Sequence, residues 1–549
     1  MLQPELQLPE AETARLWELE HRANVLGEYG FRRLKSALTN NDPAALLALL
    51  TSDFHGTFAD SGDSVELQGE TVRAHRVLNG GQSSAEQLAA KDFVERLLEL
   101  REPIGSVSGC SIGVKRIGPV DRDEPAGPWE TTAQLWLRGD SAGSRIETTA
   151  IFRLRTPQPK KAHLAENPWI RQWTILETSF ARSDRAAFRD VTAEAGLDVT
   201  RLHDNWDSQK KINNLGGVYV CDFNQDHVAD VLITDVNPTG NTLYVGQPDG
   251  TFRDVTNLIG VGRIRQVSLA MGNAAFVDLN NDGWVDLLHT EGGIWENRGG
   301  TEFIERTNDS NLFEVLDRRN VEVKAVSVAD YDRDGLLDLY ALRRNEMPTS
   351  WLESTGEGPG NVLCRNLGNW QFENVTEQTN TDGHQHLIFT TVWLDYDNDF
   401  WPDIAVINEF GDSFLYRNVH GERFEKVDPD PNKSDFGSMG VDVGDVNNDG
   451  LIDLYIAGMY SKAGSRVIGN LDPKAFPQSV MDRLHSLIDG SELYLNQDGQ
   501  SFAAAGYANR VHDVGWSWGP TLADFNNDGW LDIYAPSGYM SRDRNRPDG

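Results

Sequence analysis

From about residue 187 onward, the 549-residue chain alternates short apolar runs with turns that are rich in Asp, Asn and Gly. Typical runs are Ala274–Val277 and Ile404–Ile407. Runs of this length, bounded by turn residues and rich in small, β-branched and aromatic side chains, are typical of buried strands rather than helices. The pattern therefore predicts a mainly β structure for residues 187–549.

A second pair of strands follows most of these runs. Leu243–Phe252 consists of an apolar run, a turn containing Pro, Asp and Gly, and a phenylalanine that opens the next strand. Ile294–Phe303, Leu415–Phe424 and Leu493–Phe502 have the same arrangement, with Asn before the turn. Each of these segments predicts a β-hairpin. Together with the two preceding strands, the hairpin gives four antiparallel strands per repeat, which is the composition of a propeller blade.

The first 186 residues have a different pattern. Apolar residues recur at three- and four-residue steps over residues 11–50, which predicts helices, with Asp42 as an N-cap and Pro43 at the first helical position. Residues 84–102 predict another amphipathic helix. The strands that follow are predicted at residues 106–117, 129–137, 145–154 and 169–180. Helices followed by long antiparallel strands predict a separate α+β domain over residues 1–186, before a second domain over residues 187–549.

The order of elements in this first domain resembles the nuclear-transport-factor-2-like (SnoaL-like) family. The resemblance rests on the helix–turn–helix opening and on the four strands after it. It implies a curved sheet that wraps a helix and leaves a pocket. Asp53 and His55 stand where they could act as acid and base at the mouth of such a pocket. A helix cap and a surface residue are the alternative interpretation of these two side chains.

A nine-residue loop of the form Asp-x-Asx-x-Asp-x-x-x-Asp lies between the first two strands of each repeat. Six copies begin at residues 222, 278, 330, 395, 445 and 524. The side chains at positions 1, 3, 5 and 9 are Asp222, Asn224, Asp226 and Asp230; Asp278, Asn280, Asp282 and Asp286; Asp330, Asp332, Asp334 and Asp338; Asp395, Asp397, Asp399 and Asp403; Asp445, Asn447, Asp449 and Asp453; and Asp524, Asn526, Asp528 and Asp532. Repeats with a period of roughly 50 residues indicate an array such as a propeller, here with six recognisable repeats and six or seven blades.

These loops present hard oxygen ligands at regular spacing. Calcium binds six to eight oxygens in flexible geometry, whereas magnesium requires a more rigid octahedron. Glycine at position 6 allows the sharp turn in four loops, but His227 and Phe400 replace it in the first and fourth, so we expect those sites to be impaired or to use another backbone conformation. An EF-hand is excluded, because its loop has twelve residues and lies between helices. The spacing predicts several bound Ca²⁺ ions, with metal-free Asx-rich turns as the alternative.

Loop, hairpin and their order together resemble the FG-GAP/VCBS repeat family, and within it the cartilage-acidic-protein-like group, over about residues 187–549. This resemblance implies a calcium-binding β-propeller related to the head of integrin α-subunits, with a role in adhesion or binding. Phe188–Thr192 has the pattern of the last hairpin strand but precedes the first metal loop. We therefore expect it to complete the sheet of the last loop and to close the ring.

The net charge of the chain argues against some classes of binding partner. The chain has 50 basic and 84 acidic residues, for a net charge of −34, which argues against nucleic acid and anionic membranes. No apolar run is long enough to predict membrane insertion, and three cysteines do not make a disulfide framework. No signal peptide is visible in this sequence. Because weak calcium loops suit the millimolar calcium found outside the cytosol, we nevertheless expect an extracytoplasmic or secreted protein.

A last group of side chains stands near the predicted inner strands: Lys324, His384, His386, Trp516 and Trp518. At a channel mouth they could bind a sugar, a carboxylate or a transition metal, and ordinary packing is the alternative. The sequence has no GxSxG, P-loop or HExxH pattern. We therefore predict a calcium-stabilised binding or adhesion module with a protein or glycan ligand on its rim. The alternative is an enzyme that acts on a glycan or small molecule at the channel mouth or the domain interface.

Overall fold

The structure is a computed structural model, in which the chain divides into two compact units. An N-terminal unit consists of Pro4–Asp190 together with Lys462–Pro477, and a repeat unit consists of Val191–Ser461 together with Gln478–Gly549. The residues that the structure describes are 8–58, 64–68, 72–78, 87–184, 188–202, 216–235, 241–258, 260, 273–290, 292–344, 359–383, 388–430, 436–509 and 511–538.

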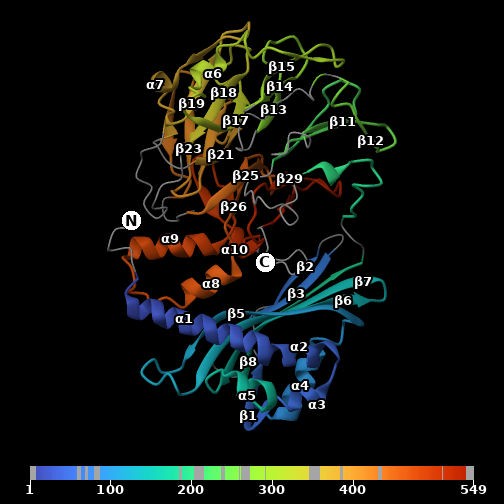
Figure 1. The fold of residues 1–549 in the computed structure, drawn as a ribbon, viewed down its shortest axis with the longest axis vertical. Helices are drawn as coiled ribbons and strands as arrows, with labels where there is room; N and C mark the ends of the chain where they lie inside the picture. Colours follow the sequence, from blue (N-terminus) through green and yellow to red (C-terminus); the bar gives the residue numbers. More distant parts are fainter. Residues whose placement is uncertain are drawn as a thin grey trace. The chain divides into compact units, whose positions relative to one another are not determined.

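The N-terminal unit begins with helices and continues with one large sheet (Figure 1). Its helices are α1 (Glu10–Val25), the π-helical η2 (Leu26–Phe31), α2 (Arg32–Thr39), α3 (Pro43–Leu47), α4 (Ala90–Glu99) and α5 (Lys161–Glu166). The N-cap prediction is confirmed, because the Asp42 carboxylate accepts the backbone N–H of Ala45 at 2.9 Å, with Pro43 at the start of α3. Local sequence therefore determines where this helix begins.

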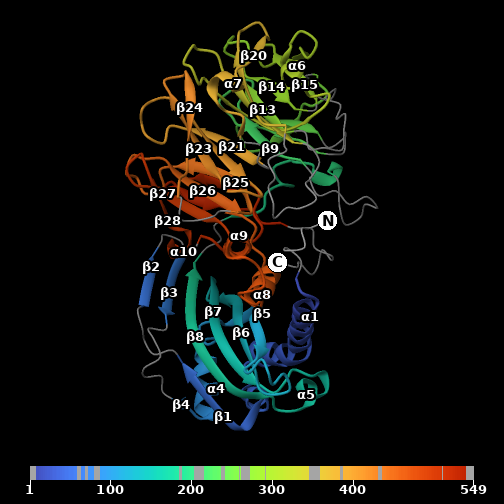
Figure 2. The same ribbon diagram turned by 90° about the vertical axis from the view of Figure 1, so that its left-hand side faces the viewer.

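The sheet of the N-terminal unit has eight strands. They are β1 (Leu50–Phe58), β2 (Ser64–Gln68), β3 (Val72–Leu78), β4 (Gln87–Leu88), β5 (Ser106–Pro119), β6 (Trp129–Ser141), β7 (Ser144–Thr156) and β8 (Ile170–Ser183). The main path runs β2-β3-β8-β7-β6-β5, and β1 pairs parallel with the first half of β8 and antiparallel with β4. Figure 2 shows the long strands β5 to β8 curving around α4. The predicted strands are present, with β1 to β4 in addition; the helix predicted over residues 84–102 begins only at Ala90, because Gln87–Leu88 forms β4 and pairs with β1.

Aromatic side chains fill the interior of this sheet. Phe93 of α4 lies 5.4 Å from Trp173 between ring centroids, Trp173 lies 5.3 Å from Phe152, and Phe152 lies 6.3 Å from Phe31. All four residues are at least 99% buried. The space between α4 and the curved sheet is therefore filled with side chains where these four rings lie, and the rings belong to one continuous core.

The segment Lys462–Pro477 completes the N-terminal unit, although it lies within the repeats in sequence. Its helix α8 (Lys462–Gly469) packs against β5. The Arg466 guanidinium lies 2.6 Å from the Glu20 carboxylate, and the backbone N–H of Ile117 donates to Asn470 Oδ1 at 3.2 Å. Sequence order alone therefore does not define this unit.

The repeat unit contains five four-stranded antiparallel sheets and one two-stranded sheet among its described residues. The sheets are β9 (Val218–Cys221), β10 (Asp230–Ile233), β11 (Thr242–Gly246) and β12 (Phe252–Asp254); β13 (Ala274–Val277), β14 (Asp286–His289), β15 (Gly293–Asn297) and β16 (Phe303–Glu305); β17 (Glu322–Ala329), β18 (Asp338–Arg344), β19 (Val362–Asn366) and β20 (Phe372–Asn374); β21 (Ile388–Leu394), β22 (Asp403–Asn408), β23 (Phe414–Val419) and β24 (Arg423–Val427); β25 (Ser438–Gly444), β26 (Asp453–Gly458), β27 (Glu492–Asn496) and β28 (Phe502–Ala504); and β29 (Thr521–Ala523) with β30 (Asp532–Tyr534). In each four-stranded sheet the strands follow one another in chain order, which confirms the predicted loop-plus-hairpin repeat.

Successive sheets lie side by side. Their first strands are neighbours in chain order, from β9 beside β13 to β25 beside β29 (Figure 1). Apolar layers fill the space between them, and the layer between the first two sheets includes Phe223, Leu287 and Phe303. The ring centroids of Phe223 and Phe303 lie 5.7 Å apart. The phenylalanine that opens the fourth strand of one repeat thus covers the metal loop of the repeat before it.

The repeat unit also contains short helices in the segments that connect or precede its strands. They are η3 (Val199–Arg201), α6 (Leu312–Val315), α7 (Thr376–Thr379), α9 (Gln478–Asp489) and α10 (Gly506–Asn509). The sequence predicts a helix at residues 473–487, and α9 confirms it with a later start, burying Val480, Met481 and Leu484. Among the described helices, none is both long and apolar enough to cross a membrane.

The predicted closing strand at Phe188–Thr192 is wrong. No strand forms over these residues, and the Phe188 side chain is 58% exposed. Tight turns follow instead, ending at Gly196, whose φ of +83° is left-handed. The carbonyl of Ala195 accepts the N–H of Phe252 at 2.7 Å, so the segment lies beside the first sheet. In the repeats, the Phe-x-x-Val-Thr pattern follows the third strand of its sheet and pairs with it, whereas Phe188–Thr192 is not part of a sheet in the described part of the chain.

Candidate metal centres

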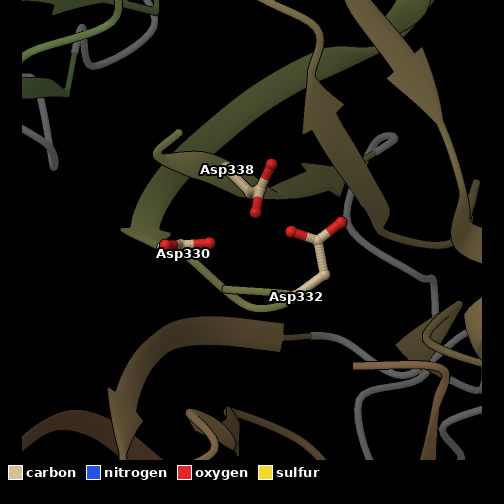
Figure 3. Close-up of side chains that lie close together, drawn as sticks. All are labelled: Asp330, Asp332 and Asp338. Atoms are coloured by element: carbon tan, nitrogen blue, oxygen red, sulfur yellow. The ribbon is translucent and has the colours of Figure 1, made fainter. Parts of the chain in front are cut away.

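The six acidic loops each join the first strand of a sheet to the second. In the third loop, one carboxylate oxygen from each of Asp330, Asp332 and Asp338 lies within 4.8 Å of the other two. Figure 3 shows these three carboxylates facing a common space. The fourth loop gathers Asp395, Asp397 and Asp403 in the same way. The predicted ligands at positions 1, 3 and 9 therefore converge in these two loops.

Backbone N–H groups hold the acidic side chains in place. In the second loop, Asp278 accepts the N–H of Asp282 at 3.1 Å and that of Gly283 at 2.8 Å, and Asp282 accepts the N–H of Trp284 at 2.9 Å. The same three bonds recur in the other five loops. All six loops therefore share one conformation.

Replacement of glycine at position 6 does not change this conformation. His227 has a φ of +68° and Phe400 a φ of +70°, close to the left-handed values of the glycines in the other loops. Each still donates its N–H to the first Asp of its loop. The backbone of the first and fourth loops is thus intact, at a strain of about 1 to 2 kcal/mol for each left-handed residue that carries a Cβ. The expected alternative backbone conformation does not occur.

The carboxylates at position 9 are buried in the first five loops, and that of the sixth, Asp532, is half-buried. Asp230, Asp286, Asp338, Asp403 and Asp453 are each 0% exposed. Burial raises the pKa of Asp230 to about 6, of Asp286 and Asp338 to about 7, and of Asp403 to about 8, although two backbone N–H bonds to each carboxyl act in the opposite direction. A buried carboxylate requires a compensating positive charge nearby.

The donor set fits calcium. Each loop offers carboxylate or amide oxygens at positions 1, 3, 5 and 9, without sulfur or imidazole at these positions. Hard oxygen donors of this kind suit Ca²⁺ rather than zinc or copper. In the first five loops, the two oxygens of the position-9 carboxylate accept one N–H apiece and keep further lone pairs for a cation. The buried carboxylates and the oxygen-only donor set are consistent with a calcium ion in each loop.

Four buried asparagines tie each loop to its neighbour. Asn297, Asn366, Asn418 and Asn496 stand in the third strand of repeats two to five and are at most 1% exposed. In the fourth repeat, Asn418 Nδ2 donates 2.9 Å bonds to the carbonyls of Pro402 in its own loop and Tyr331 in the preceding loop. The other three make the same two bonds. Gly246 occupies this position in the first repeat.

A second set of bonds joins the tips of the loops. Residues at position 4 donate from their side-chain amides to the carbonyl at position 6 of the next loop: Gln225 to Gly283 at 2.6 Å, Asn281 to Gly335 at 3.2 Å, Asn398 to Gly450 at 3.0 Å and Asn448 to Gly529 at 3.0 Å. Between the third and fourth loops, the Arg333 guanidinium lies 5.4 Å from the Trp401 ring instead. The loops therefore form a continuous row.

Two arginines contact the loops that have four aspartates. Arg365 Nε lies 2.7 Å from Asp332 Oδ2, and its Nη2 lies 2.9 Å from Asp334 Oδ2. Arg417 Nε lies 2.7 Å from Asp397 Oδ2 in the fourth loop. Sequence reasoning missed these residues and the four asparagines. A detectable signal was present, since Arg precedes the hairpin Asn only in the repeats that have Asp at position 3.

Asp53 and His55 are not placed at a pocket by the described residues. Asp53 is exposed, and hydrogen bonding from Thr51 lowers its pKa. The interior behind β1 is filled by the aromatic core. A pocket of about 260 Å³ in this unit is lined by Lys35 and Cys110 among others, but by neither Asp53 nor His55. Both residues lie within strand β1 rather than at a helix end, so the capping interpretation does not apply, and Asp53 is a surface residue.

The structure brings together only part of the predicted aromatic–His–Lys group. Trp516 and Trp518 stack with ring centroids 6.4 Å apart, and Trp518 lies 5.7 Å from Phe389. Both indoles pack against an apolar cluster that contains Met439. Lys324 instead pairs with Glu322 at 2.6 Å. The predicted residues His384 and His386 lie outside the described residues.

Comparisons with known proteins support the repeats. A family model described as FG-GAP-like repeat matches residues 216–289 and 395–456, which include the first, second, fourth and fifth loops. No curated protein sequence matches the chain. Among solved structures, an LEH-like epoxide hydrolase of M. tuberculosis is 16% identical over 29% of this chain and 83% of that chain, with a TM-score of 0.15, a value from which we draw no argument. The chain thus contains FG-GAP-like repeats.

Proposed function

We propose that the repeat unit is a calcium-stabilised β-propeller of the cartilage-acidic-protein-like, integrin-α-like group, and that it serves as a binding or adhesion module outside the cytoplasm. The observation that carries this proposal is the row of six acidic loops with one conformation, five of which bury the carboxylate at position 9. Meandering four-stranded sheets with adjacent first strands, together with the FG-GAP-like match, support the propeller arrangement. The N-terminal unit, with its curved sheet and helices, is proposed to be a nuclear-transport-factor-2-like domain.

Each loop would hold one Ca²⁺ through its side chains at positions 1, 3, 5 and 9. The ion supplies the positive charge that the buried carboxylate at position 9 lacks. Because that carboxylate also accepts an N–H from the third strand, for example from Asn418 to Asp403 at 2.7 Å, the loop and the hairpin are fastened together. The role of the bound ion in this proposal is structural.

A protein or glycan ligand on the rim of the repeats is the partner class we propose, without nucleic acid or membrane insertion. The net charge of −34 supports the exclusion of polyanions. The enzyme alternative lacks a matching observation in the described residues, because the Trp516–Trp518 pair is packed in an apolar cluster and the N-terminal interior is filled. A binding module is the function that this geometry supports best.

The test is a metal analysis of the purified full-length chain, followed by equilibrium dialysis against Ca²⁺ and Mg²⁺. We expect several calcium ions per chain and weak competition by magnesium. The variant Asp403→Asn should lose one ion, whereas Asp309→Asn, outside the loops, should lose none. A glycan array probed with calcium and then with chelator tests the ligand class. Absence of calcium at millimolar concentrations would overturn the proposal.

A further inference from the structure

The six loops do not carry the same number of carboxylates. The first, second, fifth and sixth loops have Asn at position 3 and three carboxylates each, while the third and fourth have Asp332 and Asp397 at this position and four carboxylates each. Carboxylate number alone would make the third and fourth loops the strongest cation sites. The two arginines change this ranking, because they stand beside these two loops.

Arg365 beside the third loop and the position-3 amide in the Asn loops both donate a hydrogen bond to the carboxylate at position 5. In the Asn loops, the side-chain Nδ2 donates to the outer oxygen of the position-5 carboxylate, at 3.0 Å from Asn224 to Asp226 and 2.8 Å from Asn447 to Asp449. Aspartate has no such donor. In the third loop, Arg365 Nη2 takes over the bond to Asp334 Oδ2 at 2.9 Å. Its Nε also lies beside the additional carboxylate, Asp332.

We propose that Arg365 and Arg417 are built-in counter-cations that set the calcium affinity of the third and fourth loops. This inference rests on the proposed function, in which the loops bind calcium. Each guanidinium offsets the additional carboxylate, so that the four carboxylates and the arginine together carry the net charge of the three carboxylates of an Asn loop, while Arg333 at position 4 adds one further positive charge in the third loop. The arginine therefore keeps the metal-free loop folded and weakens its attraction for Ca²⁺. All loops are thereby adjusted to a similar affinity.

Geometry makes the third loop the better test. Arg365 contacts both carboxylates within 2.9 Å, whereas Arg417 Nη2 lies 3.8 Å from Asp399. The planar guanidinium fork suits two carboxylates at once, which a lysine ammonium does not. Arg365 is 38% exposed on its side chain, so solvent screens its charge and the expected changes in affinity are modest.

The experiment compares Arg365→Met, Asp332→Asn and the double variant in the full-length chain. Thermal unfolding in excess EDTA reports the metal-free state, and calcium titration with a competing chelator reports affinity. Arg365→Met should lower the melting temperature in EDTA and bind calcium about three- to fivefold more tightly at the affected site. The double variant, which recreates an Asn loop, should return both values to those of the wild type. Arg423→Met removes a surface partner of Glu425 and should change neither.

The outcomes separate this inference from the proposed function. Additive effects in the double variant, or no effect of Arg365→Met in EDTA and in calcium, would overturn the counter-cation role while leaving calcium binding intact. Weaker calcium binding in Arg365→Met would overturn it as well, since the arginine would then be organising the ligands. A third outcome is that the double variant restores the melting temperature in EDTA but no variant binds calcium. This outcome would support the charge compensation and overturn the proposed function.

Discussion

The two units of this chain bury different kinds of side chain. The N-terminal unit packs one sheet around a continuous core that includes Phe93, Phe152 and Trp173, and the polar residues buried with them include uncharged Thr131 and Thr148. The repeat unit divides its apolar side chains into several layers and buries an aspartate at the start of the second strand of five sheets. The two units thus differ in what they bury: the N-terminal core consists mainly of apolar side chains, whereas the repeat unit also buries carboxyl groups, which we expect to make its stability depend on charge.

Removal of calcium should produce the largest contrast between the units. A ligand that binds only the folded state adds about 2.7 kcal/mol per site at a hundredfold excess over Kd. We expect chelation to lower the melting temperature and to accelerate hydrogen exchange in β9–β30, with little change in β5–β8. Exchange measured by mass spectrometry on peptides of each unit checks this. Equal acceleration in both units, or none in the repeats, would contradict the comparison.

The second largest contrast between the units should be the way in which their stability depends on pH in the absence of metal. Burial raises the folded-state pKa of Asp286, Asp338 and Asp403 to about 7, 7 and 8, above the usual value of 3.8. Folded carboxyls of this kind hold protons that the unfolded chain has released, so their stabilising contribution is complete below about pH 4 and is lost as pH rises toward 8. In EDTA, the repeat unit should therefore become less stable from pH 5 to 8.5, by up to about 1.4 kcal/mol per pH unit for each group.

If the loops bind calcium as proposed, the ion should reverse the sign of this dependence, because it favours the ionised carboxylates. With calcium present, the repeat unit should be stable at pH 8 and should lose stability as the pH falls below about 6. Urea titrations at several pH values, with hydrogen exchange to assign the transitions, measure both profiles. A repeat unit in EDTA that gains stability with rising pH would show that the buried aspartates are already compensated by other groups.

Sequence predicted the local structure of both units well. The periodic loop and hairpin give the strands of the repeats, and the 3.6-residue pattern with Asp42 and Pro43 gives the first helices. Such features depend on neighbours in the chain, which the sequence displays directly. The acidic loops were placed by their spacing, and three of the four candidate ligand side chains lie close together in the third and in the fourth loop.

Features that depend on distant partners were not predicted. Phe188–Thr192 has a strand pattern but does not form a strand, and Lys462–Pro477 leaves the repeats to pack against β5. The role of Asn418 was hidden, because an asparagine before a turn is a common hairpin residue. Arg365 was missed since it lies 31 residues from Asp334 in sequence. A pattern within one repeat cannot show which other repeat or strand a side chain will reach.

Truncation of an aromatic residue in the N-terminal core should be independent of calcium. Phe93 is fully buried and packs against Phe54, Phe58 and Trp173. Phe93→Ala should lower the free energy of unfolding of this unit by about 3 to 5 kcal/mol, with or without chelator. Phe400→Ala is a matched control, because Phe400 is 76% exposed, and should change stability by less than about 0.5 kcal/mol. A calcium-dependent loss in Phe93→Ala would contradict the separation of the two units.

The smallest expected effect concerns the asparagines that join neighbouring loops. Asn418→Ala removes both side-chain N–H bonds and leaves the carbonyls of Tyr331 and Pro402 without this donor in a buried site. We expect a loss of about 1 to 3 kcal/mol and faster hydrogen exchange in both the third and the fourth repeat, because one residue serves two loops.

Asn398→Ala is the control for this prediction, since it removes one exposed bond to Gly450 and should cost about 0.5 kcal/mol or less. The two variants change the same residue type in the same repeat, so they differ mainly in burial and in the number of bonds lost. Faster exchange confined to the fourth repeat in Asn418→Ala would show that the bond to Tyr331 does not transmit stability. The repeats would then be held together by their apolar layers and by the bonds between loop tips, and the contrast with the N-terminal unit would rest on the buried aspartates.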